Sequence, residues 1–366
     1  MDERVARMAL CAVGHLASPA LAELVAQEGA EWVWASLKQA GESSALSRRA
    51  QVVDLAEIER LTVRCGARFL IPGDDEWPAG LASLASALVG QQGGEPSGLW
   101  VRGRRLEDTD KGVALVGARA ASQYGEHVAM ELAADLAALG RPIISGLAYG
   151  IDAAAHRGAL SVGGPTVAVV ASGVDQPYPA GNAGLATMIG RRGTIVSEVP
   201  PGTSPTRPAF LARNRLIAAL GAGIVVVEAA LRSGAKNTAA WGNEIGRVVM
   251  AVPGPVTSST SQTPHRLIRD GQAVLVTDSR DVRELLDPLG TVEEAPRRGE
   301  DVPLDRLSED QRTVREAFEV GEEVGAGTIA RRTGLPMAVC LATLEELAQD
   351  RWIEEGESGG WCLPHA

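Results

Sequence analysis

Between residues 110 and 290, short apolar runs alternate with amphipathic helical patterns, and this alternation constrains the fold more than any other feature. Runs such as GVALVGA, PTVAVVASG and AGIVVVEA are apolar almost throughout, as expected for strands covered on both faces. A helical pattern follows each run; EHVAMELAADLAALG, for example, has its stop signal at Gly140. Strands that alternate with helices in this way predict an α/β fold with a Rossmann-like, doubly wound parallel sheet.

The segments on either side of this region have other patterns. Residues 1–70 show apolar residues at three- and four-residue spacing, which predicts a small helical domain. The runs RFLIPGDDEWPAGLASL and SGLWVRGRR predict two strands at the start of a Rossmann-like domain over 71–290. A charged, proline-containing linker is expected at 291–306, and the pattern of three helices and a hairpin over 307–366 predicts a winged helix.

The net charge of −11 is unevenly distributed along the chain. Residues 1–99 hold 8 basic and 13 acidic side chains, and residues 291–366 hold 8 and 17. Residues 100–290 hold 19 basic and 16 acidic side chains, so the predicted α/β region alone has a net positive charge. Because phosphate binding depends on a local basic patch and not on the charge of the whole chain, this region remains compatible with a polyanionic ligand.

Neither a membrane segment nor a metal site is predicted. No apolar run is long enough to span a bilayer, and the acidic start does not resemble a signal peptide. The four cysteines are scattered, without a CxxC pair, and the histidines do not cluster. We therefore expect a cytoplasmic protein with reduced cysteines and no metal or other cofactor.

Segments rich in Gly, Ser and Arg follow the predicted strands, at the sheet edge where open parallel sheets bind ligands. They are VGARAASQYG at 116–125, SGLAYGIDAAAHRGAL at 145–160, ASGVDQPYPAGN at 171–182 with SEVPPGTSPTRPAFLARNRLIAAL at 197–220, and VVVEAALRSGAKNTAAWGNEIGR at 225–247. Each segment combines a predicted turn with side chains that can bind an anion.

In the first segment, Gly117 permits a sharp turn, Arg119 offers a guanidinium to phosphate, and Ser122 is expected to cap the next helix. Arg119 stands where a G-x-G-x-x-G fingerprint has its second glycine, which disfavours a dinucleotide site. In the second segment, Asp152 and His156 share a helical face. Because a third metal ligand is missing, we interpret Asp152 as favouring the helix N-terminus and His156 as making a structural hydrogen bond.

In the third segment, Arg213, Asn214 and Arg215 are placed at the start of a helix, after a proline-rich loop. Two arginines at a helix N-terminus oppose the helix dipole, so an anion is predicted to bind beside them. In the fourth segment, SGAKNTA lacks the spacing of a Walker phosphate loop, but its polar residues still predict phosphate contacts. Glu228 is expected to orient neighbouring basic groups and not to act as a base.

The sequence contains no G-x-S-x-G elbow, no Cys–His signature and no metal triad, so we expect a binding protein and not an enzyme. Several anion sites along one sheet edge favour a nucleic acid backbone. Candidate base-stacking side chains in these segments are Tyr124, Tyr149, Tyr178 and Phe210.

The motifs GxRxxSxYG, SGLAxGIDxxAH, SEVPPG, RNRLIAAL, VVVEA, SGAKNTA and AVPGP, in this order over roughly residues 70–285, resemble those of the DNA-processing protein A (DprA, or Smf) family. The resemblance implies a protein that binds and protects single-stranded DNA and loads the RecA recombinase during natural transformation and recombination. It also implies an extended Rossmann fold, a SAM- or helix-hairpin-helix-like domain over residues 1–70, and a homodimer formed near Leu267 and Ile268. Its DNA pocket maps onto Gly117, Arg119, Ser122, Ser145, Gly146, Gly173, Arg213 and Asn214, with Lys236, Asn237 and Thr238 nearby. Many members carry a basic residue where Ala180 follows Tyr178-Pro179 here.

Two alternatives stay open. A Rossmann-like nucleotide phosphoribohydrolase would carry a PGGxGTxxE loop, which VVEAALRSGAKNT does not supply. A winged-helix regulator would read DNA with the helix expected at 336–350, but PMAVCLATLEELAQD has three acidic residues and no Lys or Arg. We therefore assign DNA binding to the Rossmann-like region and interpret the C-terminal domain as partner-facing.

Overall fold

The computed structural model describes residues 1–14, 16–292, 303–356 and 358–364. It separates into two compact units, Met1–Val292 and Glu293–Ala366. The helical and Rossmann-like regions expected from the sequence both lie in the first unit. Of the linker expected at 291–306, residues 293–302 lie outside the described residues.

A nine-stranded sheet runs through the described part of the first unit. In spatial order its strands are β1 (Ala67–Leu70), β4 (Leu99–Gly103), β8 (Thr194–Ser197), β7 (Thr166–Val169), β6 (Ile143–Ser145), β5 (Val113–Val116), β9 (Gly223–Val226), β10 (Val248–Ala251) and β11 (Val274–Leu275). All neighbours from β8 to β11 are parallel, which confirms the predicted fold class. The two strands predicted ahead of this region, β1 and β4, form an antiparallel edge of the same sheet.

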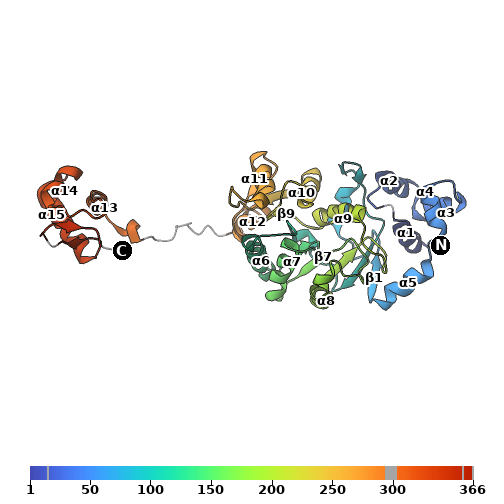
Figure 1. Ribbon diagram of the computed structural model, residues 1–366. Helices are drawn as coiled ribbons and strands as arrows, with labels where there is room; N and C mark the ends of the chain where they lie inside the picture. The colour runs from blue at the N-terminus through green and yellow to red at the C-terminus, as the bar shows by residue number, and fades with distance from the viewer. Residues whose placement is uncertain (15, 293–302, 357, 365–366) are drawn as a thin grey trace. The chain divides into compact units, whose positions relative to one another are not determined.

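Helices cover both faces of the sheet (Figure 1). One face carries α6 (Gln123–Ala138), α7 (Ile151–Ser161), α8 (Ala183–Arg192) and α12 (Ser279–Leu286), and the other carries α9 (Arg207–Leu220), α10 (Ala235–Glu244) and α11 (Gln262–Arg269). Along β5, Val113 and Leu115 pack towards α6, whereas Ala114 and Val116 pack towards α9. Because both faces are buried, the strands need apolar residues at successive positions, which explains the apolar runs in the sequence.

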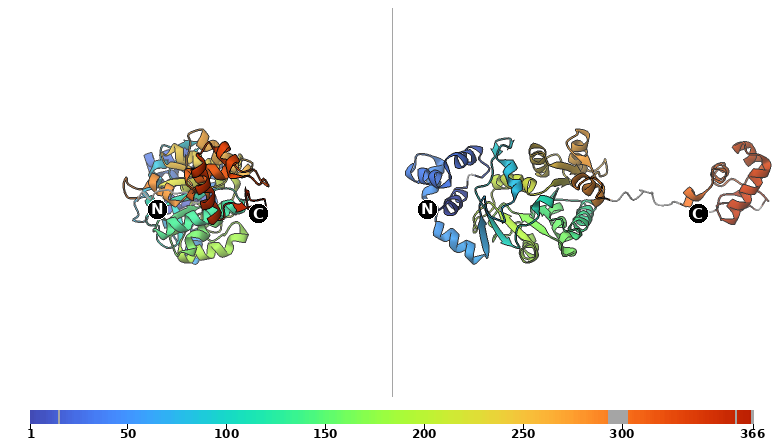
Figure 2. Two further views of the ribbon diagram at one scale, coloured as in Figure 1. Left: turned by 90° about the vertical axis from the view of Figure 1, so that its left-hand side faces the viewer. Right: turned by 180° about the vertical axis from the view of Figure 1, so that it is seen from behind.

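The N-terminal helices gather beside the β1 end of the sheet, as Figure 2 shows in blue. They are α1 (Glu3–Ala12), α2 (Pro19–Glu28), α3 (Ala30–Gln39), α4 (Ala45–Gln51) and α5 (Leu55–Arg64), and a short hairpin of β2 (Leu88–Val89) and β3 (Gln92–Gly93) precedes β4. Polar contacts connect the helices to the sheet. Trp100 on β4 donates its indole N–H to the Thr62 hydroxyl of α5 over 3.0 Å.

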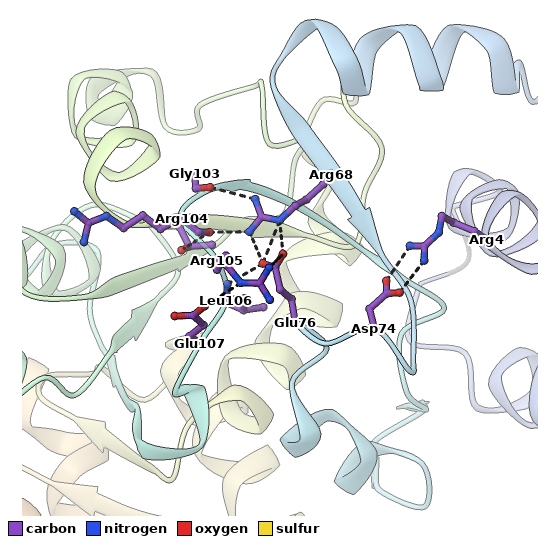
Figure 3. A network of polar contacts seen from close by, with 10 residues as sticks. Arg4, Arg68, Asp74, Glu76, Gly103, Arg104, Arg105, Leu106 and Glu107 are labelled. Carbon is purple, nitrogen blue, oxygen red and sulfur yellow. Dashed lines mark hydrogen bonds and ion pairs between the residues drawn. The ribbon is translucent and has the colours of Figure 1, made fainter.

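Ion pairs near β1 also connect these segments (Figure 3). Arg4 of α1 donates to both carboxylate oxygens of Asp74, over 2.8 and 2.7 Å. Arg68 of β1 bonds to Glu76, whose carboxylate also accepts from the backbone N–H of Leu106. The segments before and after β4 are thereby held against the N-terminal helices and β1.

The C-terminal unit contains α13 (Glu309–Glu316), α14 (Ala326–Thr333), α15 (Met337–Gln349) and a hairpin of β12 (Glu354–Glu355) and β13 (Trp361–Cys362). This matches the expected order of three helices and a hairpin; its assignment as a winged helix stays a prediction. In the parts of the chain that the structure describes, no helix combines the length and apolar character needed to cross a membrane.

Candidate functional site

A cleft of about 1000 Å³ opens where the direction of the sheet topology reverses. Strands β5, β6, β7 and β8 follow one another to one side, and α9 then returns the chain to β9 on the other side of β5. The loops after β5 and β9 therefore diverge, and the crevice between them is the usual ligand position of an open α/β sheet. Its walls are the loops after β5 and β9, the first half of α9, and the turn at Ser259–Ser261.

The described residues that line this cleft carry more positive than negative charge. Four of them are arginines, namely Arg119, Arg207, Arg213 and Arg232, and the acidic one is Asp152. Three of the arginines are exposed, whereas Arg213 is only 7% exposed. The cleft is therefore a cationic depression in a chain whose net charge is −11.

Arg213 is held in place at the floor of the cleft. Its guanidinium donates from Nη1 to the carbonyl oxygen of Val169 over 2.7 Å. Burial lowers the pKa of Arg213 to about 10, and nearby Asp152 partly offsets this effect, so Arg213 stays charged at neutral pH. A Cβ at position 146 would overlap the guanidinium, so Gly146 is the residue that makes room for it.

Asp152 and His156 have the structural roles expected from the sequence. Asp152 lies in the first turn of α7 and accepts the backbone N–H groups of Gly146 and Ala148, over 3.1 and 3.3 Å. Nδ1 of the fully buried His156 lies 2.7 Å from the Thr166 hydroxyl. Burial raises the pKa of Asp152 and lowers that of His156 to about 3. Among the described residues, no group of three or more His, Cys, Asp or Glu is arranged to hold a metal ion.

Ser122 caps α6 as predicted, because its hydroxyl accepts the N–H of Gly125 over 3.1 Å. The prediction that Glu228 orients neighbouring basic groups was wrong. Its carboxylate accepts the N–H of Ser122 over 2.9 Å, the Ser122 hydroxyl over 2.7 Å and the Thr260 hydroxyl over 2.9 Å, and no basic side chain bonds to it among the described contacts. Strand pairing decides this outcome, because it places the end of β9 beside the end of β5 and the start of α6.

The expected position of Arg213, Asn214 and Arg215 at a helix start was also wrong. Helix α9 begins at Arg207 and has Thr206 as its cap, so the three residues lie in its middle. Proline is tolerated in the first turn of a helix, so Pro208 does not delay the start of α9. The argument that two arginines oppose the dipole of a helix N-terminus therefore does not apply to them.

Arg215 is on the side of α9 that faces away from the cleft. Its guanidinium donates two hydrogen bonds of 2.7 Å to Glu198 and one of 3.1 Å to the carbonyl oxygen of Gly94. The residue is 1% exposed and is absent from the cleft lining. The structure therefore separates Arg215 from the other predicted site residues and gives it a role in packing.

The remaining predicted residues fall into three groups. Gly117, Asn214 and Thr238 line the cleft. Asn237 bonds to Asn214, Lys236 is exposed on the first turn of α10, and the buried Ser145 donates to the carbonyl oxygen of Leu115. Gly173 lines a separate pocket of about 170 Å³ with Arg102 and Asp175.

Sequence reasoning did not single out two of the arginines that line the cleft. Arg207 follows the proline-containing SPT segment, and Arg232 precedes SGAKNT. Arg207 is the first residue of α9, and Arg232 lies in the turn that precedes α10. Both follow a predicted strand end and precede a helix, and this position was the available signal. Of the four aromatic candidates, Tyr178 and Phe210 line the cleft, whereas the Tyr124 hydroxyl donates to the carbonyl oxygen of Pro253.

Tyr178, Phe210 and the arginines form one contact group. The Tyr178 and Phe210 rings lie 5.6 Å apart between centroids. The guanidinium carbon of Arg119 lies 5.0 Å from the Phe210 centroid, and that of Arg213 lies 6.0 Å from it. The cleft therefore offers cationic groups and π-faces within reach of a single bound molecule.

Comparisons with known proteins agree with this architecture. Residues 68–287 match the family model for DNA recombination-mediator protein A. A putative DNA processing protein DprA of Mycobacterium tuberculosis is 46% identical over 319 residues, which are 83% of this chain and 81% of that protein. The X-ray structure of DprA from Streptococcus pneumoniae is 31% identical with a TM-score of 0.64, covering 77% of this chain and 97% of that one.

A structure of DNA processing protein A from Helicobacter pylori, described for its single-stranded DNA binding mode, is 27% identical with a TM-score of 0.52 and covers 59% of this chain and 93% of that one. The family match spans more than half of the chain, over the same sheet and cleft that the motifs predict. The chain therefore belongs to the DNA recombination-mediator protein A (DprA/Smf) family.

Proposed function

We propose that the chain binds single-stranded DNA in the arginine-lined cleft. The observation that carries this proposal is the meeting of four arginines with Tyr178 and Phe210 in one cleft at the topological switch point. Guanidinium groups bind backbone phosphates, and aromatic rings stack on bases. Bases are available for stacking only when the strand is unpaired, so this combination favours single strands over duplex.

The predicted site residues take different parts in this proposal. Gly117, Arg119, Arg213, Asn214 and Thr238 contact the DNA directly, and Arg207 and Arg232 join them. Ser122, Ser145 and Gly146 position the cleft walls. Lys236 and Asn237 contact DNA that leaves the cleft over the first turn of α10. Gly173 follows β7, on the other side of β5 from α10, and contacts DNA that leaves the cleft on that side. Arg215 is omitted because its guanidinium is committed to Glu198.

The wider role is that of a recombination mediator, and membership of the family supports it. The cytoplasmic protein protects single strands, promotes their annealing, and loads RecA on them during DNA uptake and recombination. It does so by binding and not by catalysis. It works as a homodimer, and because Leu267 packs in the core of its own chain, the neighbouring half-buried Ile268 is the better candidate for the interface.

The test is a salt titration of binding to an oligo-dT and to a duplex of equal length, followed by fluorescence anisotropy. We expect tighter binding of the single strand, and the logarithm of the binding constant should fall linearly with the logarithm of the salt concentration. Arg119→Ala should reduce the slope by about 0.7, the value of one phosphate contact on a single strand. Equal affinity for both ligands, or no binding at moderate salt, would refute the proposal.

The matched control is Arg192→Ala. Arg192 is also exposed, but it lies in the last turn of α8, just before the amino end of β8 and therefore at the opposite edge of the sheet. Its replacement should leave both affinity and slope unchanged. A slope that falls equally in both variants would show that binding depends on net charge and not on the cleft.

A further inference from the structure

The N-terminus of α6 is where a nucleotide-binding Rossmann fold would hold a phosphate. It follows directly on the loop after β5, beside the topological switch point, and the first backbone N–H groups of this 16-residue helix have no partner within the helix. In dinucleotide-binding folds the pyrophosphate binds at this first helix N-terminus. In the present chain a side chain of the protein itself already occupies this position.

The group that fills it is the side chain of Glu228, which comes from the end of β9. One carboxylate oxygen accepts the backbone N–H of Ser122 over 2.9 Å. The other accepts the Ser122 hydroxyl over 2.7 Å and the Thr260 hydroxyl over 2.9 Å. These donors, a helix N-terminal N–H and two hydroxyls, are those that a phosphate takes at such a site.

The surrounding residues are adapted to this carboxylate. Glu228 is 2% exposed, so it is shielded from solvent. A Cβ at position 125 would overlap its carboxylate, so Gly125, in the first turn of α6, leaves the space that Glu228 occupies. The backbone carbonyl of Glu228 also accepts the N–H of Ala118 over 2.6 Å, which fixes the strand end against the loop after β5.

We propose that Glu228 is an internal anion that occupies the phosphate position of this fold and thereby determines which ligands the cleft accepts. The phosphate of a mononucleotide cannot enter this position, because the buried carboxylate fills the space and its negative charge repels the phosphate. Phosphates are left with the four cleft arginines, which lie on the loop after β5, on α9 and on the loop after β9, and which suit a polymer with several phosphates. The inference does not depend on which polyanion the cleft binds.

The experiment measures binding of inorganic pyrophosphate to the full chain by calorimetry. The variants are Glu228→Ala, Glu228→Gln and the control Glu126→Ala. Glu126 is an exposed carboxylate in the first turn of the same helix, so its removal changes the charge near the helix end without emptying the position. Pyrophosphate bound by the cleft arginines is a background common to all four proteins.

We expect Glu228→Ala to gain a pyrophosphate site that the wild type lacks. If Glu126→Ala also gains a site, the site in Glu228→Ala should bind pyrophosphate at least tenfold more tightly. Glu228→Gln should gain no such site, because its amide still fills the space. No additional site in Glu228→Ala, an equal gain in Glu126→Ala, or an additional site in Glu228→Gln would overturn the proposal.

Glu228→Ala also loses contacts that hold three segments together, so its stability is measured in a pyrophosphate series. An anion that replaces the carboxylate should raise the melting temperature of Glu228→Ala more than that of Glu126→Ala, because a ligand stabilises the state that binds it. An equal rise in both variants, or a Glu228→Ala chain that stays unfolded at saturating pyrophosphate, would overturn the inference. Failure of single-stranded DNA binding would leave these outcomes unaffected, so the two proposals are tested separately.

Discussion

The ion pair between Arg215 and Glu198 allows two roles of Arg215 to be distinguished. The sequence motif suggests that Arg215 contacts an anion, whereas the structure gives its guanidinium a buried partner within the chain. The side chains of Arg215 and Glu198 are 1% and 9% exposed, and the pair is bidentate with two contacts of 2.7 Å. Arg215→Met keeps most of the side-chain volume but leaves a buried carboxylate without its cation. Breaking a buried pair in this way costs about 3–5 kcal/mol, a large part of the about 5–15 kcal/mol that stabilises a typical domain.

The measurement is urea unfolding of the full chain, followed by tryptophan fluorescence, since Trp100 and Trp241 are fully buried in the same unit. The double variant Glu198→Leu with Arg215→Met should recover most of the loss, because replacing both partners of a buried pair by apolar residues is often neutral. The exposed Arg60, which pairs with Glu57 at the surface, serves as the control, and Arg60→Met should leave the unfolding midpoint unchanged.

The same variant separates a packing role from a DNA contact. Under conditions where Arg215→Met is folded, its binding of oligo-dT should keep the salt slope of the wild type. A destabilisation below about 1 kcal/mol would contradict the buried-pair argument. A slope reduced by about 0.7 in the folded variant would place Arg215 on the DNA instead.

Three further outcomes are expected. Burial lowers the pKa of His156 to about 3, so on acidification the unfolded state takes up the proton first. The contribution of neutral His156 to the free energy of unfolding is therefore complete above about pH 6.5 and falls by up to about 1.4 kcal/mol per pH unit towards pH 3. In acid unfolding, His156→Asn should lose less stability than the wild type over this range, and identical pH profiles would contradict this. Gly146→Ala should displace the Arg213 guanidinium and weaken oligo-dT binding about tenfold, measured by fluorescence anisotropy. The control is Gly184→Ala in α8, which should bind as the wild type does because its added Cβ meets nothing within 4 Å. Equal affinities of the two variants would contradict the placement of Arg213 at the floor of the cleft. Phe210→Leu should cost about 1–3 kcal/mol of binding per stacked base with an unchanged salt slope, and a changed slope without loss of affinity would exclude stacking.

Features that depend on neighbouring residues in the sequence were predictable. The strands from β5 to β10 follow from apolar runs, because burial on both faces requires them. The cap at Ser122 and the place of Asp152 in the first turn of α7 follow from preferences within one helical turn. The motif order also indicated the family that the comparisons show.

Features that depend on the direction of a side chain were not predictable. Arg213 and Arg215 are two residues apart on one helix, so they point to different sides of it, one to the cleft floor and one to Glu198. The start of α9 decided their place in the helix, and the tolerance of its first turn for proline concealed that start.

The sequence by itself determined the parallel α/β architecture, the sheet edge that carries the glycine-, serine- and arginine-rich segments, and the family, because these depend on local periodicity and on ordered motifs. Only the tertiary structure decided that Arg119, Arg207, Arg213 and Arg232 share a cleft, and that Glu228 bonds to Ser122 and Thr260. The pairing of β5 with β9 brings together segments more than 100 residues apart, as Ser122 and Glu228 are. Such contacts depend on strand order and on the face that each side chain takes, and neither is encoded in a short stretch of sequence.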